Sequence, residues 1–280
     1  MQPRQQVTFA RVRPVCAGLP DPNPHLLGII RDWTRKQGRD LPSYWEMSRP
    51  DEQFAQFCAD AHQQAEHSPL EFRTRESYRA LIADIGEQFH LLVGAGYTIT
   101  PWRGDGQPYR DSREMRVDVR RNRRLFVYPT SGLSRDHPLA QPVMSGWCWN
   151  DIFRAVHDIV GHAATGFQFG PIGEENAFRF HATVQSASAL PALAAETRLQ
   201  NCWVNFGPHL RDEDGNLIRP GEPGYLPPST RPYAAQKAFA PIAGAIDCAL
   251  WTRFLQMSTA SALRPPGESE RRCARDILGT

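Results

Sequence analysis

Residues 150–164 read NDIFRAVHDIVGHAA, and the interpretation of the whole chain starts from this stretch. Its apolar side chains recur three and four positions apart, which predicts a helix with one buried face. Asn150 or Asp151 is expected to cap its start, because short polar side chains accept hydrogen bonds from free backbone N–H groups there. The helix carries two histidines, His157 and His162, and imidazoles placed close together bind iron, zinc, copper or nickel.

Similar patterns elsewhere predict a mainly α fold. The expected helices cover residues 24–36, 51–66, 75–92, 150–164, 174–189, 191–204 and 233–263, the last interrupted at Pro241. Residues 97–102 alternate between polar and apolar side chains, and residues 115–119 and 125–128 could pair around a turn at 120–124. We therefore expect a helical metal-binding core with a small accessory antiparallel β region.

One domain is expected over residues 1–280. Within it we predict an irregular N-terminal segment at 1–50, a helix with the small β region at 75–130, and the helical metal-binding core at 145–263. A chain of 280 residues that is 41% hydrophobic can bury a large core.

Composition excludes several classes of partner. The formal net charge is +2, and acidic residues are interspersed among the arginines of residues 110–124, which argues against nucleic acid as a partner. The longest apolar stretch, 238–251, is broken by Pro241 and Asp247, so we expect no membrane span. The first residues lack the apolar segment of a secretory leader, which favours a cytoplasmic protein. The six cysteines are scattered without a CxxC pair, which argues against a disulfide framework and a zinc finger.

A stretch of 40 residues that begins at His157 also supplies anionic oxygen and a further imidazole. The acidic residues and the histidine are Asp158, Glu174, Glu175, His181 and Glu196. His157 and His162 are five apart, which is about 140° around an ideal helix. In one arrangement Gly161 loosens the helix end and both histidines reach one metal with a distant glutamate. In another, Asp158, His162 and His181 join the glutamates in a two-metal site inside a helix bundle.

The segment His157-Asp158-Ile159-Val160-Gly161-His162 resembles the His-Glu-x-x-Gly-His motif of the pterin-dependent aromatic amino acid hydroxylases. In that family the two histidines and a later glutamate hold iron. Residues 175–180 and the Val-Asn-Phe-Gly segment at 204–207 are loosely similar to later parts of the same family, whose Val-Glu-Phe-Gly segment carries the iron glutamate. The good match covers about six residues, and the loose one covers about 125–237.

Two departures from the family affect what the resemblance implies. Asp158 stands where the motif has glutamate, and Asn205 stands where the iron glutamate would be. An amide is a poor replacement for an anionic ligand, so the family's iron site is not reproduced in full. The resemblance therefore does not establish that the protein uses the family's pterin, which we keep only as a candidate cofactor beside Fe(II). We assign the carboxylate ligand to Glu196, with Glu174 and Glu175 as alternatives.

The expected function is that of a non-heme iron-dependent oxygenase or hydroxylase that uses O₂ on a small substrate of the aromatic or amino-acid type. His157, His162 and Glu196 would hold Fe(II). Asp158 would orient an imidazole N–H, and Glu175 and His181 would act behind the ligands or at a second metal. A polar or carboxylate-bearing substrate would be bound by Arg198, Gln200 and Asn201.

Two other functions fit the same residues. The His157-Asp158 doublet also suits a metal-dependent phosphohydrolase of the HD type, which needs an earlier histidine and a later aspartate, here His137 and Asp247. Alternatively, the chain is a non-enzymatic helical binding protein in which the histidines and glutamates form a buried polar network.

Overall fold

The computed structural model describes residues 16–144, 146–241 and 243–246. The chain divides into two units, Met1–Pro241 and Ile242–Thr280. Of the second unit the structure describes residues 243–246, which include a short 3₁₀ turn, Ala243–Ala245. The description below concerns the first unit.

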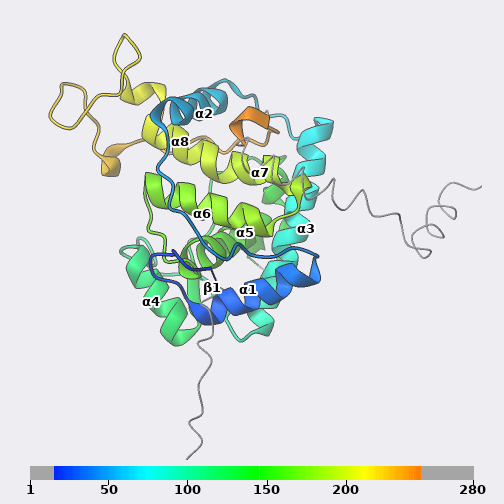
Figure 1. Ribbon diagram of the computed structural model, residues 1–280. Coiled ribbons are helices and arrows are strands. Elements are labelled where there is room, and N and C mark those ends of the chain that lie inside the picture. Colours follow the sequence, from blue (N-terminus) through cyan, green and yellow to red (C-terminus); the bar gives the residue numbers. More distant parts are fainter. Residues whose placement is uncertain (1–15, 145, 242, 247–280) are drawn as a thin grey trace, which may run out of the picture. The chain divides into compact units, whose positions relative to one another are not determined.

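The first unit is mainly α-helical, as predicted (Figure 1). Its α-helices are α1 (Pro24–Lys36), α2 (Glu52–Gln64), α3 (Phe72–Gly94), α4 (Ser112–Asn122), α5 (Trp149–His157), α6 (Pro171–Val184), α7 (Leu190–Ala194) and α8 (Gln200–Phe206). Two π-helical turns, η2 (Asp158–Ala163) and η4 (Ala195–Leu199), continue α5 and join α7 to α8. Short 3₁₀ turns lie at η1 (Pro138–Ala140), η3 (Ala187–Ala189), η5 (Pro208–Leu210) and η6 (Pro228–Thr230).

Local sequence signals explain where these helices start. Asn23 accepts a hydrogen bond from the backbone of Leu26, and Pro24 occupies the first turn of α1. In α5 the cap is Cys148, two residues before the expected cap at Asn150. Asp151 instead lies one turn inside the helix, where its carboxylate accepts the N–H of Cys148 at 2.8 Å.

Helix α3 is the longest helix in the described chain and lies against α5 and α7 (Figure 1). Its buried side chains recur at the helical spacing predicted from the sequence, and they are Tyr78, Leu81, Ile85, Phe89 and Leu92. Helix α6 in turn contacts η2, α7, η4 and α8, while α2 packs on α8. The segment around His157 is therefore packed between α3 and α6.

The β structure differs from the prediction in part. Strands β1 (Thr98–Pro101) and β2 (Arg124–Val127) pair in parallel, with α4 as the crossover between them. Strands β3 (Pro142–Met144) and β4 (Trp147–Cys148) form the small antiparallel sheet. The strand expected at 115–119 is wrong, because these residues belong to α4. Met115 and Val119 are four apart and both buried, which fits a helix face as well as a strand over so short a segment.

The helix predicted at residues 233–263 is also wrong over the part of it that the structure describes. Residues 233–241 have no regular secondary structure, and residues 247–263 lie outside the described residues, as do Cys248 and Cys273. Among the described residues of the expected core at 145–263, the last α-helix ends at Phe206. The N-terminal segment expected to be irregular contains α1, which matches the helix predicted at 24–36. Among the described residues, no helix has the length and apolar character needed to cross a membrane.

His62, in α2, gives the fold a pH-dependent stability. The ring is buried, and its Nε2 lies 3.1 Å from the carbonyl of Ala235. Burial, and then the charge of Lys237, lower the pKa of His62 to about 4. The unfolded chain, with a histidine pKa of about 6.5, therefore binds one proton more than the folded chain between these two values. Stability is fully present above about pH 6.5 and falls as the pH is lowered toward 4, by at most about 3 kcal/mol from this residue.

We predict that His62→Gln flattens this fall, because glutamine can still donate to Ala235 but does not titrate. Urea unfolding at pH 7 and at steps down to pH 4.5 measures the effect. His90→Gln, at an exposed histidine of α3, is the matched control and should keep the wild-type pH dependence. Equal pH dependence in wild type and His62→Gln would contradict the assignment.

Candidate metal centre

A π-helical turn brings the two histidines of the motif to the same side of the chain. His157 is the last residue of α5, and His162 lies in η2. The N–H of Ala164 reaches the carbonyl of Ile159 at 2.8 Å, five residues back rather than four. The two imidazole rings consequently face each other edge to face, with centroids 5.1 Å apart. This is the arrangement in which the helix end is loosened at Gly161.

Gly161 also leaves room for the first imidazole. A Cβ at this position would lie 3.3 Å from Cε1 of His157 and 3.2 Å from Cβ of Ala177. Glycine therefore permits the close approach of α6 to the π turn.

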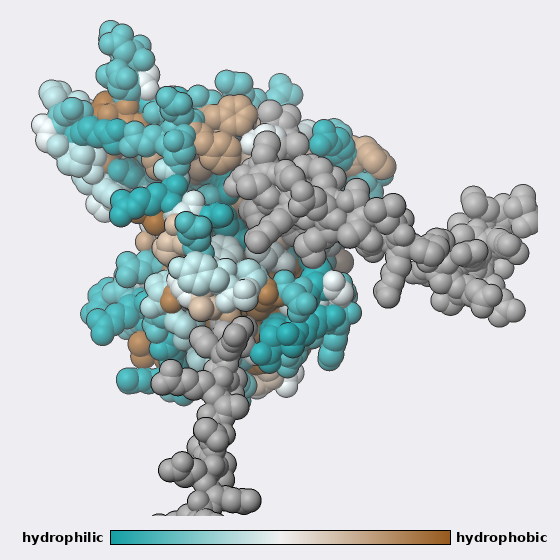
Figure 2. Space-filling model, viewed as in Figure 1, coloured by the Kyte–Doolittle hydropathy of each residue, from teal (hydrophilic) through white to brown (hydrophobic). Residues whose placement is uncertain are grey.

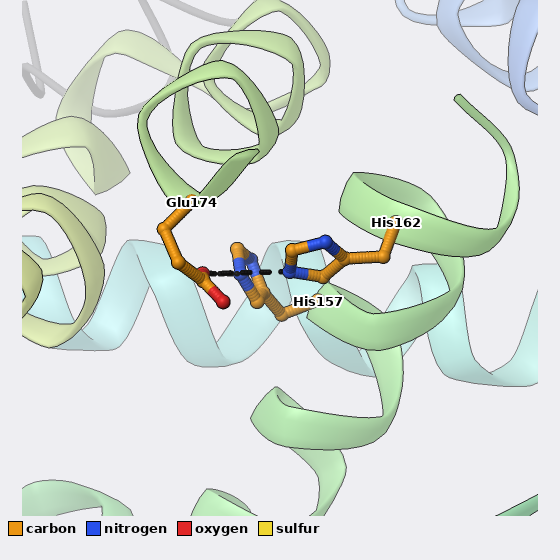
Figure 3. Close-up of side chains that lie close together, drawn as sticks. All are labelled: His157, His162 and Glu174. Carbon is orange, nitrogen blue, oxygen red and sulfur yellow. Dashed lines mark hydrogen bonds and ion pairs between the residues drawn. The ribbon is translucent and has the colours of Figure 1, made fainter. Parts of the chain in front are cut away.

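Helix α6 supplies the carboxylate. Glu174 lies in its first turn, and its Oε2 is 3.5 Å from Nε2 of His157 and 3.4 Å from Nε2 of His162 (Figure 3). One ligand atom from each of the three side chains lies within 4.8 Å of the other two. Among the described residues, no other group of three or more histidine, cysteine or acidic side chains brings its ligand atoms this close together. Two ligand atoms, each about 2.1 Å from one ion, are about 3.0 Å apart at a right angle and about 3.4 Å apart at the tetrahedral angle. The observed separations match an ion held between the three atoms.

Both imidazoles are supported from behind. Nδ1 of His162 lies 3.1 Å from the backbone carbonyl of Phe167, so this nitrogen donates its proton there, and Nε2, which faces Glu174, is the nitrogen available to a metal. Nδ1 of His157 lies 3.3 Å from Nδ1 of His181, a fully buried residue of α6. Arg116 of α4 shares the Phe167 carbonyl, with its Nη1 3.4 Å away.

The charges of the three candidate ligands influence one another. Burial by itself raises the pKa of Glu174, but the neighbouring His162 and His157 outweigh burial and lower it overall. Burial is the largest single effect on the pKa of His162 and lowers it, but Glu174, Asp158 and the carbonyl of Phe167 together outweigh burial, so the net shift is upward. The pKa of His181 is well below its ordinary value because of burial and the proximity of His157 and His162. The site therefore combines an ionised carboxylate with imidazoles that can share its charge.

The centre is reached from the side of Glu174. The side chain of His162 is 1% exposed and that of His157 11%, whereas that of Glu174 is 27% exposed. Phe169 is an exposed aromatic residue whose ring lies 5.0 Å from the ring of His162, nearly perpendicular to it. An apolar side chain therefore borders the accessible side of the centre.

The assignment of Glu196 as the ligand requires a correction. Glu196 lies in η4, where its Oε1 accepts a hydrogen bond from the hydroxyl of Tyr78 and lies 3.1 Å from Nε2 of His137. Gln200 donates to the other oxygen at 3.1 Å. The structure therefore turns Glu196 toward a separate buried cluster and brings Glu174 to the histidines.

Glu175 and Arg198, expected near catalysis and substrate, form a buried ion pair instead. Nε of Arg198 donates to Glu175 at 2.8 Å, and a second, Nη2 contact makes the pair bidentate. The guanidinium of Arg198 also stacks on the ring of Phe178 at 4.1 Å. Because Arg198 is 0% exposed, it is engaged within the protein and is not available to a substrate.

The remaining residues of the predicted site have other contacts. Gln200 is bonded to Glu196, as noted, and Asn201 donates to the carbonyl of Pro171 at 3.3 Å, which holds the start of α6. Asn205 is hydrogen-bonded to Asn201 and to Arg231, so the loosely similar Val-Asn-Phe-Gly segment supplies no ligand from this position. These contacts position α6 and α8 rather than a ligand.

Asp158 does not orient either imidazole. Its carboxylate has no hydrogen bond to another described residue, and burial raises its pKa against the opposing effect of His162 and His157. Two other groups take the role expected of Asp158: the backbone carbonyl of Phe167 beside His162, and the imidazole of His181 beside His157. The histidine of the HD alternative, His137, belongs to the Glu196 cluster, and Asp247 lies outside the described residues.

Several supporting groups were not predicted from the sequence. A backbone carbonyl such as that of Phe167 has no residue-type signature, and Gln88 comes from α3, far away in the chain. Gln185, in contrast, follows His181 by four positions, so a search for partners on the same helix face could have found it. Comparison with family models, curated proteins and solved structures returned no match.

We predict that Gly173→Ala weakens the centre. A Cβ at Gly173 would lie 1.7 Å from the carbonyl oxygen of Gln168, so the loop that carries the Phe167 carbonyl must move away from α6. Overpacking of this kind costs about 1–3 kcal/mol of stability. We expect a lower free energy of unfolding and at least about tenfold weaker Co(II) binding, as for other losses of support behind a ligand.

The matched control is Gly28→Ala in α1, where an added Cβ meets nothing within 4 Å. It should leave Co(II) affinity unchanged and stabilise the helix by about 0.5–1 kcal/mol. Unaltered Co(II) binding in Gly173→Ala would show that the loop does not support the ligands.

Proposed function

We propose that this chain is a mononuclear non-heme iron enzyme in which His157, His162 and Glu174 hold Fe(II). The observation that carries the proposal is the convergence of two Nε2 atoms and one Oε2 atom, each imidazole having a partner behind its Nδ1. Two histidines and one carboxylate occupy one side of an iron ion and leave positions open for O₂ and substrate.

The surroundings support oxidation of a small apolar or aromatic substrate. The ligands are buried except on the side of Glu174, so a substrate would approach from there and exclude water from the ion. Phe169 would pack against an apolar part of the substrate at this opening. Arg198 is withdrawn from the substrate by its pairing with Glu175, which removes the main reason to expect a carboxylate-bearing substrate.

A ligand set of two histidines and a glutamate also binds zinc in hydrolases. The resemblance of His157–His162 to the aromatic amino acid hydroxylase motif favours iron. The position of His137 beside Glu196 removes one of the residues that an HD phosphohydrolase would need. We therefore rank oxygen-dependent oxidation above metal-dependent hydrolysis.

We predict that Glu174→Gln reduces the affinity for Fe(II) and Co(II) at least about tenfold, because a neutral amide donates less charge to the ion than a carboxylate. Isothermal titration under argon measures the affinity, with circular dichroism as the check on folding. Glu196→Gln is the matched control: it should lower stability through its lost hydrogen bonds but retain the metal. The reverse pattern in the two variants would return the ligand assignment to Glu196.

We further predict that the Fe(II)-loaded protein consumes O₂ in the presence of a substrate from a panel of aromatic and other amino acids, and that His162→Ala does not. Oxygen uptake and mass spectrometry of the products measure this, beside anaerobic reactions with a nucleotide panel. Nitric oxide, an O₂ analogue, tests the open position without a substrate: it should change the EPR spectrum of the Fe(II) form. Oxygen-independent release of phosphate that is lost in Asp158→Ala would favour the hydrolase instead.

A further inference from the structure

His181 lies directly behind the candidate ligand His157 and away from the ion position. It is 0% exposed, its ring stacks on that of Phe153 at 6.4 Å, and its Nδ1 is 3.3 Å from Nδ1 of His157. Its Nε2 faces two buried amides, with Oε1 of Gln88 at 3.3 Å and Nε2 of Gln185 at 2.6 Å. Both ring nitrogens of His181 are therefore in use inside the protein.

A contact between two Nδ1 atoms requires one nitrogen to donate and the other to accept. If the proton of this contact is on His181, then His157 accepts at Nδ1 and carries its own proton on Nε2, directed at Glu174. Nε2 of His181 then accepts from the amide of Gln185. This set gives each of the four imidazole nitrogens a partner and leaves the buried Oε1 of Gln185 without one among the described residues. It blocks Nε2 of His157, because a protonated nitrogen cannot bind a metal.

The opposite set leaves Nε2 of His157 free. His157 then donates from Nδ1 to Nδ1 of His181, and His181 carries its proton on Nε2 and donates it to Oε1 of Gln88. Gln88 is held by its own amide, which points to the carbonyl of Val184 at 3.5 Å. Nε2 of Gln185 lies only 2.6 Å from the donating Nε2 of His181, so the amide of Gln185 must turn over in this set. Its buried Oε1, which otherwise has no hydrogen-bond partner among the described residues, then accepts from His181.

We propose that His181 is a positioning residue that sets the tautomer of His157, and that metal binding switches the tautomers of both rings together. The inference rests on the proposed function only in placing a metal at Nε2 of His157. On loading, the Nε2 proton of His157 leaves, the Nδ1 proton of His181 passes to Nδ1 of His157, and Nε2 of His181 takes up one proton from solvent. The pair carries two protons before and after, and both rings stay neutral.

Nitrogen-15 NMR of the imidazoles tests the switch in the wild-type protein, because the two nitrogens of a neutral ring differ in shift according to which is protonated. Zn(II) serves as a diamagnetic probe. We expect His181 to be protonated at Nδ1 in the metal-free protein and at Nε2 in the Zn(II) form. The same tautomer of His181 in both forms overturns the proposal.

Two substitutions test the positioning role through Co(II) affinity. His181→Leu fills a similar volume without an acceptor and should weaken Co(II) binding about 10–100-fold, the usual effect of losing a partner behind a metal ligand. His181→Asn places an amide oxygen near the former Nδ1 and should recover most of the affinity. A purely structural role predicts that affinity follows stability, with the smaller asparagine no better than leucine.

The outcomes separate this inference from the proposed function. Wild-type affinity in His181→Leu overturns the relay while leaving the metal centre intact. Zn(II) and Co(II) binding with the expected tautomers, but no oxygen chemistry, overturns the proposed reaction and supports the relay. A wild-type protein that binds neither ion overturns both.

Discussion

The backbone step from Ile159 to Ala164 is the constraint on which the candidate centre depends. In a regular α-helix, His157 and His162 would project about 140° apart, and no single ion could reach both. The π turn removes this mismatch by inserting one residue into the helical path. The departure is secured locally, since Thr165 returns its hydroxyl to the carbonyl of Gly161 and Gly166 donates to the carbonyl of His162 at 2.8 Å. Such turns are frequent at functional sites.

The three glutamates of the second half of the chain occupy three different environments. Glu174 faces two imidazoles, Glu175 pairs with Arg198, and Glu196 accepts from Tyr78 and Gln200. A buried carboxylate without partners is costly, so each environment supplies its own donors. Of the three, only the environment of Glu174 combines two imidazole nitrogens with a partly exposed side, as a reactive metal site would require. The other two carboxylates hold the helices around it.

The contacts behind the candidate ligands link distant parts of the chain. The carbonyl that holds His162 belongs to the loop before α6, and that loop can approach α6 only because residue 173 is glycine. His181 connects His157 to Gln88 of α3, the helix on which α5 and α7 pack. The geometry of the centre is thus tied to the packing of the core, because a shift of α3 or of the loop would change the orientation of an imidazole.

The sequence by itself determined the helical class and the existence of α1, α2 and α3. It also singled out His157 and His162 as candidate metal ligands. Both results follow from periodicity and motif spacing, which are local properties of the chain. It left three glutamates open, since residues 12 to 34 positions beyond His162 can reach it only through a fold that the spacing does not encode. It also misassigned 115–119, where the burial of residues four apart fits strand and helix alike. Tertiary structure alone decided that Glu174 meets the histidines, because that contact needs the π turn, the first turn of α6 and the close approach at Gly173 together.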